Sequence, residues 1–198
     1  MKLQPSQWTA LEQMVTQALA ESSRSLSQMT TGEIRLDAPQ LSFVPLRELP
    51  GVAGGPDHVV TAVYVGIEGE LQGHVILLFQ PKEARALVDL LLGHPAGTCR
   101  ELDELGRSAL AEVGNICGSA FMNAIADRSG LEVKPTPPVL LEDMAGAILQ
   151  TVATDLLLTG DEALVIATGF NGAVPGHFLL MPNTESMARL ITTLEAIR

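Results

Sequence analysis

The feature of this sequence that most constrains its fold is an internal repeat. The run Gly73–Leu78 (GHVILL) recurs as Gly176–Met181 (GHFLLM), and each run is soon followed by Pro and by a helical pattern containing Glu and then Ala. Self-similarity of this kind indicates that one set of secondary-structure elements occurs twice. The sequence therefore predicts two internal repeats, at about residues 6–93 and 101–198.

The predicted elements follow a similar order in both repeats, with a long amphipathic helix first and a strand hairpin near the end. The first repeat is predicted to contain a helix over 6–29 with Ser6 as N-cap, an extended segment over 34–46, strands over 58–67 and 71–79, and a helix over 82–92. The second is predicted to contain a helix over 101–128, a proline-containing extended segment, a mixed stretch over 143–158, strands over 163–168 and 177–181, and a helix over 183–197.

Neither repeat has enough strands to form, alone, a sheet that helices can bury. We therefore expect both hairpins to join one mainly antiparallel sheet, whose apolar face is covered by the two long helices. The predicted fold class is α+β, in a single pseudo-two-fold domain over residues 1–198.

Charge and cysteine content exclude several kinds of function. The 198 residues carry 23 acidic and 12 basic side chains, a net charge of −11, and the basic residues are scattered, which argues against nucleic acid as a partner. Cys99 and Cys117 are too few for a disulfide scaffold and lack zinc-site spacing, so no metal site is predicted. Because neither a membrane-spanning run nor a signal peptide is recognisable, we expect a cytoplasmic protein without membrane insertion.

The second long helix is predicted to carry a polar stripe opposite an apolar one. Spacings of four, three and four residues place one set of polar side chains on one face: Ser108, Glu112, Asn115 and Ser119. The apolar stripe, expected to face the core, consists of Leu110, Val113, Cys117 and Phe121. Gly114 and Gly118 each destabilise a helix by about 1 kcal/mol relative to Ala. Either a close approach of another backbone to the polar stripe or tight packing against the sheet would explain them.

The motif on this helix resembles the signature of the CheC/CheX/FliY family of chemotaxis phosphatases. The pattern is Ser-x3-Glu-x2-Asn, formed by Ser108, Glu112 and Asn115, with Pro138 following after 22 intervening residues. The duplication extends the resemblance over nearly the whole chain and makes the sequence most similar to CheC.

The same frame is present in the first long helix, but its functional side chains are not. It holds Thr9, Gln13 and Thr16, and Pro39 follows after 22 intervening residues. Spacing and proline persist, whereas the acidic residue and the terminal amide are replaced. We therefore expect a degenerate first site and one active site per chain.

The resemblance implies a phosphatase that hydrolyses the phospho-aspartate of a CheY-like response regulator. In that role the Asn115 carboxamide would orient the attacking water, and Glu112 would pair with a Lys of the regulator. Ser108 and Ser119 would support the interface, and Pro138 would shape the neighbouring extended segment. The chain itself would bind no cofactor, because the Mg²⁺ of the reaction would be held by the regulator.

An alternative from another functional class stays open at this point. The duplicated fold can be a non-catalytic interaction module that binds a response regulator, a CheD-like deamidase or a component of the flagellar switch. The resemblance would place a deamidase partner on the helical segment after Asp143.

Overall fold

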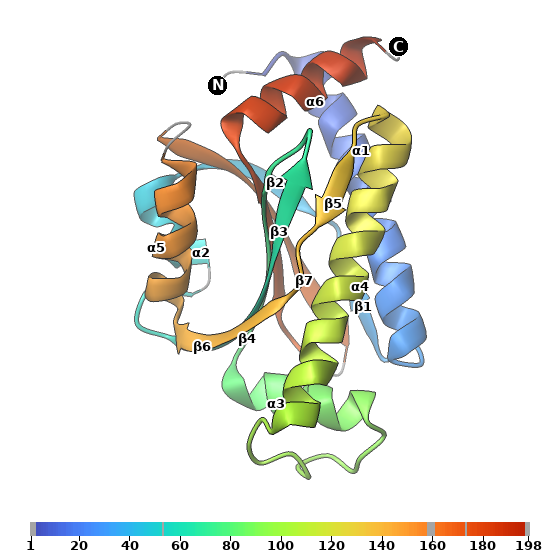
Figure 1. The fold of residues 1–198 in the computed structure, drawn as a ribbon, viewed down its shortest axis with the longest axis vertical. Coiled ribbons are helices and arrows are strands. Elements are labelled where there is room, and N and C mark those ends of the chain that lie inside the picture. Colours follow the sequence, from blue (N-terminus) through green and yellow to red (C-terminus); the bar gives the residue numbers. More distant parts are fainter. Residues whose placement is uncertain (1–2, 53, 158–160, 173, 197–198) are drawn as a thin grey trace.

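The two halves of the chain contain matching sets of elements in the computed structural model, which describes residues 3–52, 54–157, 161–172 and 174–196. The first half contains α1 (Pro5–Met29), β1 (Ile34–Leu36), β2 (Gln40–Pro45), a 3-10 turn (Leu46–Glu48), α2 (Leu49–Val52), β3 (Val59–Gly69), β4 (Gly73–Phe79) and α3 (Pro81–Leu91). The second half contains α4 (Glu104–Ser129), β5 (Val133–Pro135), β6 (Val139–Met144), α5 (Ala145–Leu156), β7 (Glu162–Gly172), β8 (His177–Pro182) and α6 (Thr184–Ala196). Helices and an antiparallel sheet confirm the predicted α+β class (Figure 1).

One curled sheet runs through the molecule in the order β1-β7-β8-β4-β3-β5, with β2 also on β7 and β6 also on β3. The short strands of each half pair with a long strand of the other half: β1 and β2 pair with β7, and β5 and β6 pair with β3. Gln40 of β2 pairs with Ala167 of β7, and Val139 of β6 pairs with Tyr64 of β3. Gln40 and Val139 are 99 residues apart in the sequence, and Tyr64 and Ala167 are 103 residues apart. The two pairings therefore occupy equivalent places in the two halves. The shift of 103 also relates Ile76 to Leu179, which pair with each other where β4 meets β8. A pseudo-two-fold axis between β4 and β8 produces this pattern.

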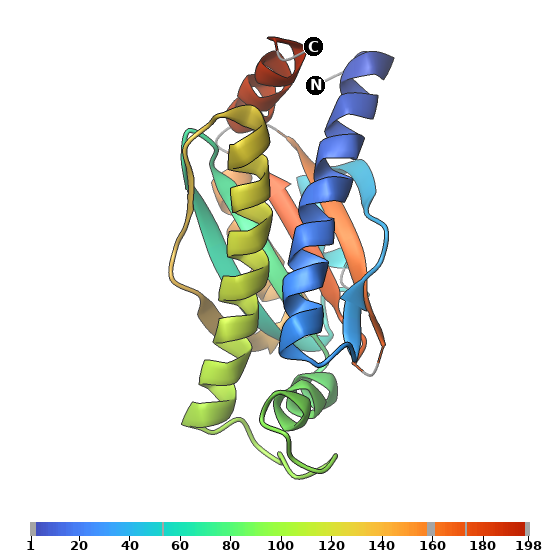
Figure 2. The ribbon, with the colours of Figure 1, turned by 90° about the vertical axis from the view of Figure 1, so that its right-hand side faces the viewer.

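The long helices α1 and α4 cover one face of the sheet. Figure 2 shows them side by side in front of the strands and running in opposite directions. Ser22 Oγ of α1 donates a hydrogen bond to the Cys117 carbonyl oxygen of α4 at 2.8 Å, which ties the helices together near their middles. Helix α1 begins one residue earlier than expected, at Pro5, so Gln4 replaces Ser6 as the N-cap.

Helices also cover the second face of the sheet, contrary to the expectation of one covered face. The stretch predicted as mixed contains helix α5, which lies with α2 on the side away from α4 (Figure 1). All seven residues of β4, Gly73–Phe79, are buried, as expected for a strand covered on both sides. The buried residues of α5 recur at helical spacing: Ala145, Ile148, Leu149, Val152, Ala153 and Leu156.

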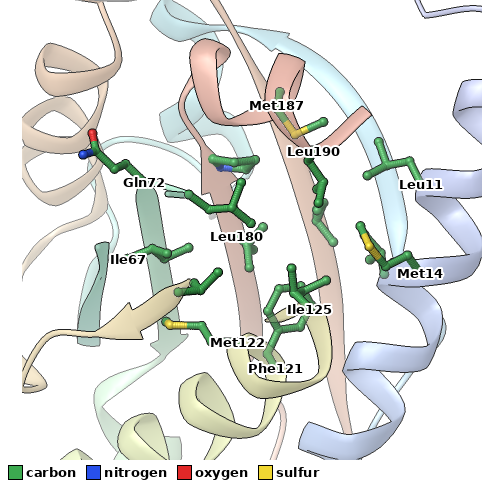
Figure 3. Close-up of a pocket in the computed structure, with 15 residues that line it drawn as sticks. Leu11, Met14, Ile67, Gln72, Phe121, Met122, Ile125, Leu180, Met187 and Leu190 are labelled. Carbon is green, nitrogen blue, oxygen red and sulfur yellow. The ribbon is translucent and has the colours of Figure 1, made fainter. Parts of the chain in front are cut away.

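The main core lies between the sheet and the α1/α4 pair, and helix α6 closes its upper end. A small cavity of about 30 Å³ lies there (Figure 3), with Met14, Met122 and Met187 among the side chains around it, whereas the amide of Gln72 points away. Flexible methionines are well suited to fill such irregular space. None of the helices in the described ranges is long and apolar enough to cross a membrane.

Candidate functional site

Helix α4 carries the predicted polar stripe and is fixed at both ends. Its N-cap Asp103 accepts a hydrogen bond from the Gly106 backbone N–H at 2.8 Å. At its other end Gly130 adopts φ 70°, a left-handed conformation that glycine accepts without strain. In Figure 2 the outward side of this 26-residue helix is turned to the viewer, beside α1. The helix therefore presents its outer side chains on a rigid support.

The structure places the four motif residues on the outer side of α4. Ser108 and Glu112 are exposed, and Asn115 and Ser119 are half-buried. The opposite stripe faces the core, which confirms that part of the prediction: Leu110, Val113, Cys117 and Phe121 are all buried.

Glu112 and Asn115 are neighbours on this surface. Asn115 Nδ2 donates to Glu112 Oε2 at 3.5 Å, the outer limit of a hydrogen bond, so the contact aligns the side chains only weakly. A carboxamide has two N–H donors and one acceptor oxygen, and this contact uses a single donor. The pair therefore offers an exposed carboxylate beside an amide that can also hold a water molecule.

Tight packing against the sheet explains the more crowded of the two helix glycines. A Cβ on Gly114 would lie 2.4 Å from Val63 Cγ1 of β3, whereas a Cβ on Gly118 would meet Val65 at an ordinary 3.6 Å. Both glycines are buried and face the sheet, not the polar stripe. The missing side chain at Gly114 lets α4 lie directly on β3, immediately beneath the site.

Pro138 lies in a bulge of the edge strand that runs beside α4. The segment from Pro135 to Val139 has one residue more than the part of β3 that it faces, between the pairs Ile67–Pro135 and Tyr64–Val139. Proline is tolerated in such a bulge because it has no N–H to donate to the sheet. Pro39 occupies the matching bulge between β1 and β2, next to β7. This position agrees with the role predicted for Pro138, which is to shape the segment, and that role stays a prediction.

The degenerate frame on α1 lies far from the α4 motif. Thr9, Gln13 and Thr16 are all exposed, and Thr9 Oγ1 donates to the Pro5 carbonyl oxygen at 3.0 Å. Because α1 and α4 are antiparallel and meet near Ser22, the rise of 1.5 Å per residue puts Gln13 and Glu112 about 20 Å apart along the helix axes. The two frames are therefore separate surfaces and do not combine into one site.

Neither cysteine belongs to a metal site in the described ranges. No group of three or more His, Cys, Asp or Glu side chains there is arranged to hold a metal ion. Cys117 is fully buried, as predicted for the apolar stripe that faces the core, and burial raises the pKa of its thiol to about 12.

Sequence reasoning missed a polar cluster on the other face of the sheet. His74 Nδ1 lies 3.1 Å from the Tyr64 hydroxyl, and its Nε2 lies 3.1 Å from Asp155 Oδ2 of α5. Burial lowers the pKa of His74, although the Asp155 carboxylate acts in the opposite direction. The sequence had suggested only that His74 and His177 are equivalent by repetition. It held no signal for the contact, because Asp155 is distant along the chain.

Comparison with known proteins shows that the segment carrying this site is similar to a known family. Residues 105–142, which include Glu112, Asn115 and Pro138, match the model of the CheC-like family. The chain is 26% identical over 182 residues to the Bacillus subtilis protein named CheY-P phosphatase CheC, covering 88% of this chain and 87% of that protein.

Solved structures share the fold at lower sequence identity. Thermotoga maritima FliY matches with a TM-score of 0.79 and 15% identity over the whole of both chains. CheX in a CheX–CheY–BeF3–Mg²⁺ complex from Borrelia burgdorferi matches with a TM-score of 0.57 and 18% identity, over 84% of this chain and 95% of that chain. A FliG–FliM complex from Helicobacter pylori gives a TM-score of 0.68 and 12% identity, over 96% of this chain and all of that chain. Together with the matched motif, these comparisons confirm the resemblance to the CheC/CheX/FliY family that the sequence predicted.

Proposed function

We propose that this chain hydrolyses the phospho-aspartate of a CheY-like response regulator in the cytoplasm, with Glu112 and Asn115 as its catalytic pair. The observation that carries the proposal is the placement of this pair. Both side chains lie together on the outer side of a rigid helix, inside the segment that matches the CheC-like family. The similarity to a protein named CheY-P phosphatase supports the same reaction.

The reaction needs a water molecule in line with the phosphorus–oxygen bond of the acyl phosphate. The water attacks phosphorus, the bond to the aspartyl oxygen breaks, and the products are the free carboxylate and inorganic phosphate. Asn115 can orient this water through its amide without acting as a nucleophile itself. Its half-buried position on α4 limits the motion of the amide. Its contribution is therefore positional.

Glu112 is proposed to bind the regulator at the same time. Its carboxylate is exposed one turn before Asn115 and can pair with a Lys beside the phosphorylation site. The pairing would fix the register of α4 on the regulator, so that Asn115 meets the phosphoryl group. The Mg²⁺ that neutralises the phosphoryl oxygens would be held by the regulator.

A non-catalytic interaction module is the second candidate function. It is favoured by the degenerate frame at Gln13 and Thr16, and by the occurrence of this fold in a FliG–FliM complex. A CheD-like deamidase is a further proposed partner, at α5. Because α5 and α4 cover opposite faces of the sheet, such a partner would leave the Glu112 surface open.

The proposal is tested by the decay of a phosphorylated, Mg²⁺-loaded CheY-like regulator in the presence of matched variants. We expect Glu112→Ala and Asn115→Ala to abolish the acceleration seen with the unmodified protein, while their circular dichroism spectra stay unchanged. Gln13→Ala and Thr16→Ala alter the corresponding exposed positions of α1 and serve as controls, with activity expected within about twofold of normal. Loss of activity in Thr16→Ala with full activity in Asn115→Ala would contradict the assignment.

A further inference from the structure

One large apolar side chain on α4 has no role in packing the core. Leu105 is 59% exposed, more than any other large hydrophobic residue with a described side chain. It lies seven residues before Glu112, which is two helical turns, or about 10 Å along the axis. At 100° per residue the two positions differ by about 20° around the helix. Leu105 therefore continues the outward line of the motif toward the N-terminus of α4.

We propose that Leu105 is the apolar anchor through which α4 binds the phosphorylated response regulator, and that it sets affinity without taking part in the chemistry. The inference rests on the proposed function, because it takes the Glu112–Asn115 surface as the one that meets the regulator. It assigns the residue a role in affinity for the regulator.

The size of a protein interface brings Leu105 within reach of a regulator that is bound at Glu112. Even a small, transient interface buries several hundred Å² on each partner, a patch roughly 25 Å across. A patch of that size centred on Glu112 reaches about 12 Å along the helix, which includes Leu105 at about 10 Å. Leu105 lies in that area and would lose its exposure to water when the regulator binds.

The support beneath Leu105 makes it a suitable anchor. The Asp103 N-cap fixes the first turn of α4, and Gly106 of that turn packs closely against α3, where an added Cβ would lie 3.3 Å from Val88 Cγ1. Because the backbone is already held, burying the Leu105 side chain requires little additional ordering. An apolar contact also adds affinity where the neighbouring motif residues are polar and well hydrated.

The other strongly exposed apolar side chains do not share this line. Val59, Val139, Leu141 and Met144 belong to β3 and β6, and Leu157 follows α5 on the far face of the sheet. Leu157 is 54% exposed, which makes it a matched control for Leu105.

The test is steady-state dephosphorylation of a CheY-like regulator, with KM and kcat measured separately. Burying the exposed part of a Leu side chain corresponds to about tenfold in affinity. Leu105→Ala is therefore expected to raise KM about tenfold and leave kcat within about twofold, whereas Leu105→Met should restore most of the affinity. Leu157→Ala should leave both constants unchanged.

Binding of the regulator loaded with BeF3 and Mg²⁺ separates this inference from the proposed function. If the unmodified protein binds this stable mimic and Leu105→Ala binds it about tenfold more weakly, the anchor stands even where no hydrolysis is found. If hydrolysis is normal and Leu105→Ala keeps the original KM and binding affinity, the anchor is refuted while the phosphatase stands. Failure of the unmodified protein both to bind and to hydrolyse would overturn both.

Discussion

Replacement of Gly114 by Ala should destabilise the protein, although alanine is the better helix former. At Gly114 the new Cβ would lie 2.4 Å from Val63 Cγ1, well inside van der Waals contact. Val63 is fully buried in β3, where it pairs with Leu77 and with Leu140, and its branched side chain has little rotational freedom. The clash must therefore be relieved by moving α4 or β3.

Gly118 provides a matched comparison one turn further along the same helix. There an added Cβ would meet Val65 Cγ1 at 3.6 Å and Met122 Cε at 3.8 Å, both ordinary contacts. Gly118→Ala should therefore stabilise the protein by about 1 kcal/mol through helix propensity. Gly114→Ala gains the same term but loses about 1–3 kcal/mol to overpacking, a net destabilisation of up to about 2 kcal/mol. The free energies of unfolding of the two variants should differ by about 1–3 kcal/mol.

Urea unfolding at fixed protein concentration measures this difference. In thermal unfolding, the Gly114→Ala variant should melt several degrees below the Gly118→Ala variant, because each kcal/mol shifts the melting temperature by about 2–4 °C. The double variant Gly114→Ala with Val63→Ala should be more stable than the two single effects add up to, because the truncated Val63 removes the clash. Equal stabilisation by Gly114→Ala and Gly118→Ala would refute the proposed tight contact between α4 and β3.

Three further predictions concern groups outside the motif. Ser22→Ala removes the 2.8 Å hydrogen bond to the Cys117 carbonyl and should reduce the free energy of unfolding by about 1 kcal/mol; an unchanged urea midpoint would contradict this. Burial lowers the pKa of His74 below its ordinary 6.5, so the unfolded chain binds the proton first, and stability should fall as pH drops from 6.5 through the folded-state pKa. In His74→Gln, the urea midpoint should fall less between pH 8 and pH 5 than in the unmodified protein. An equal fall in both proteins would contradict this prediction. In native protein a thiol reagent should modify Cys99, which is half-buried, and reach Cys117 only upon unfolding; equally fast labelling of both would disprove the buried thiol.

The predictable parts of the fold are those whose residue pattern is compatible with only one type of secondary structure. The long helices and both hairpins follow from apolar spacing. The second helical layer was missed, although β4 from Gly73 to Phe79 is apolar throughout, a pattern that favours burial on both faces. The strands β2 and β6 were expected only as extended segments, because each adjoins a proline-containing bulge, and their pairing with β7 and β3 is set by the opposite half of the chain.

The candidate site also has features that the sequence predicted and features that it did not. Helical spacing was sufficient to put Glu112 and Asn115 on one outward stripe, because the repeat distance of an α-helix is fixed. The exposure of Leu105 was not predictable, since an apolar residue near a helix end can equally pack against a neighbour such as α3. The contact of His74 with Asp155 depends on how α5 lies on the sheet, which only the folded chain reveals.

Turnover tests most directly whether this protein is a catalyst. A phosphorylated CheY-like regulator should be mixed with a tenth of its concentration of this protein, and the release of inorganic phosphate should be followed to completion. Each molecule of the protein is expected to release many equivalents of phosphate, faster than the regulator alone, whereas Asn115→Ala should release none above that background. Unaccelerated release, together with measurable binding of the regulator, would contradict catalysis and would make the chain a docking module.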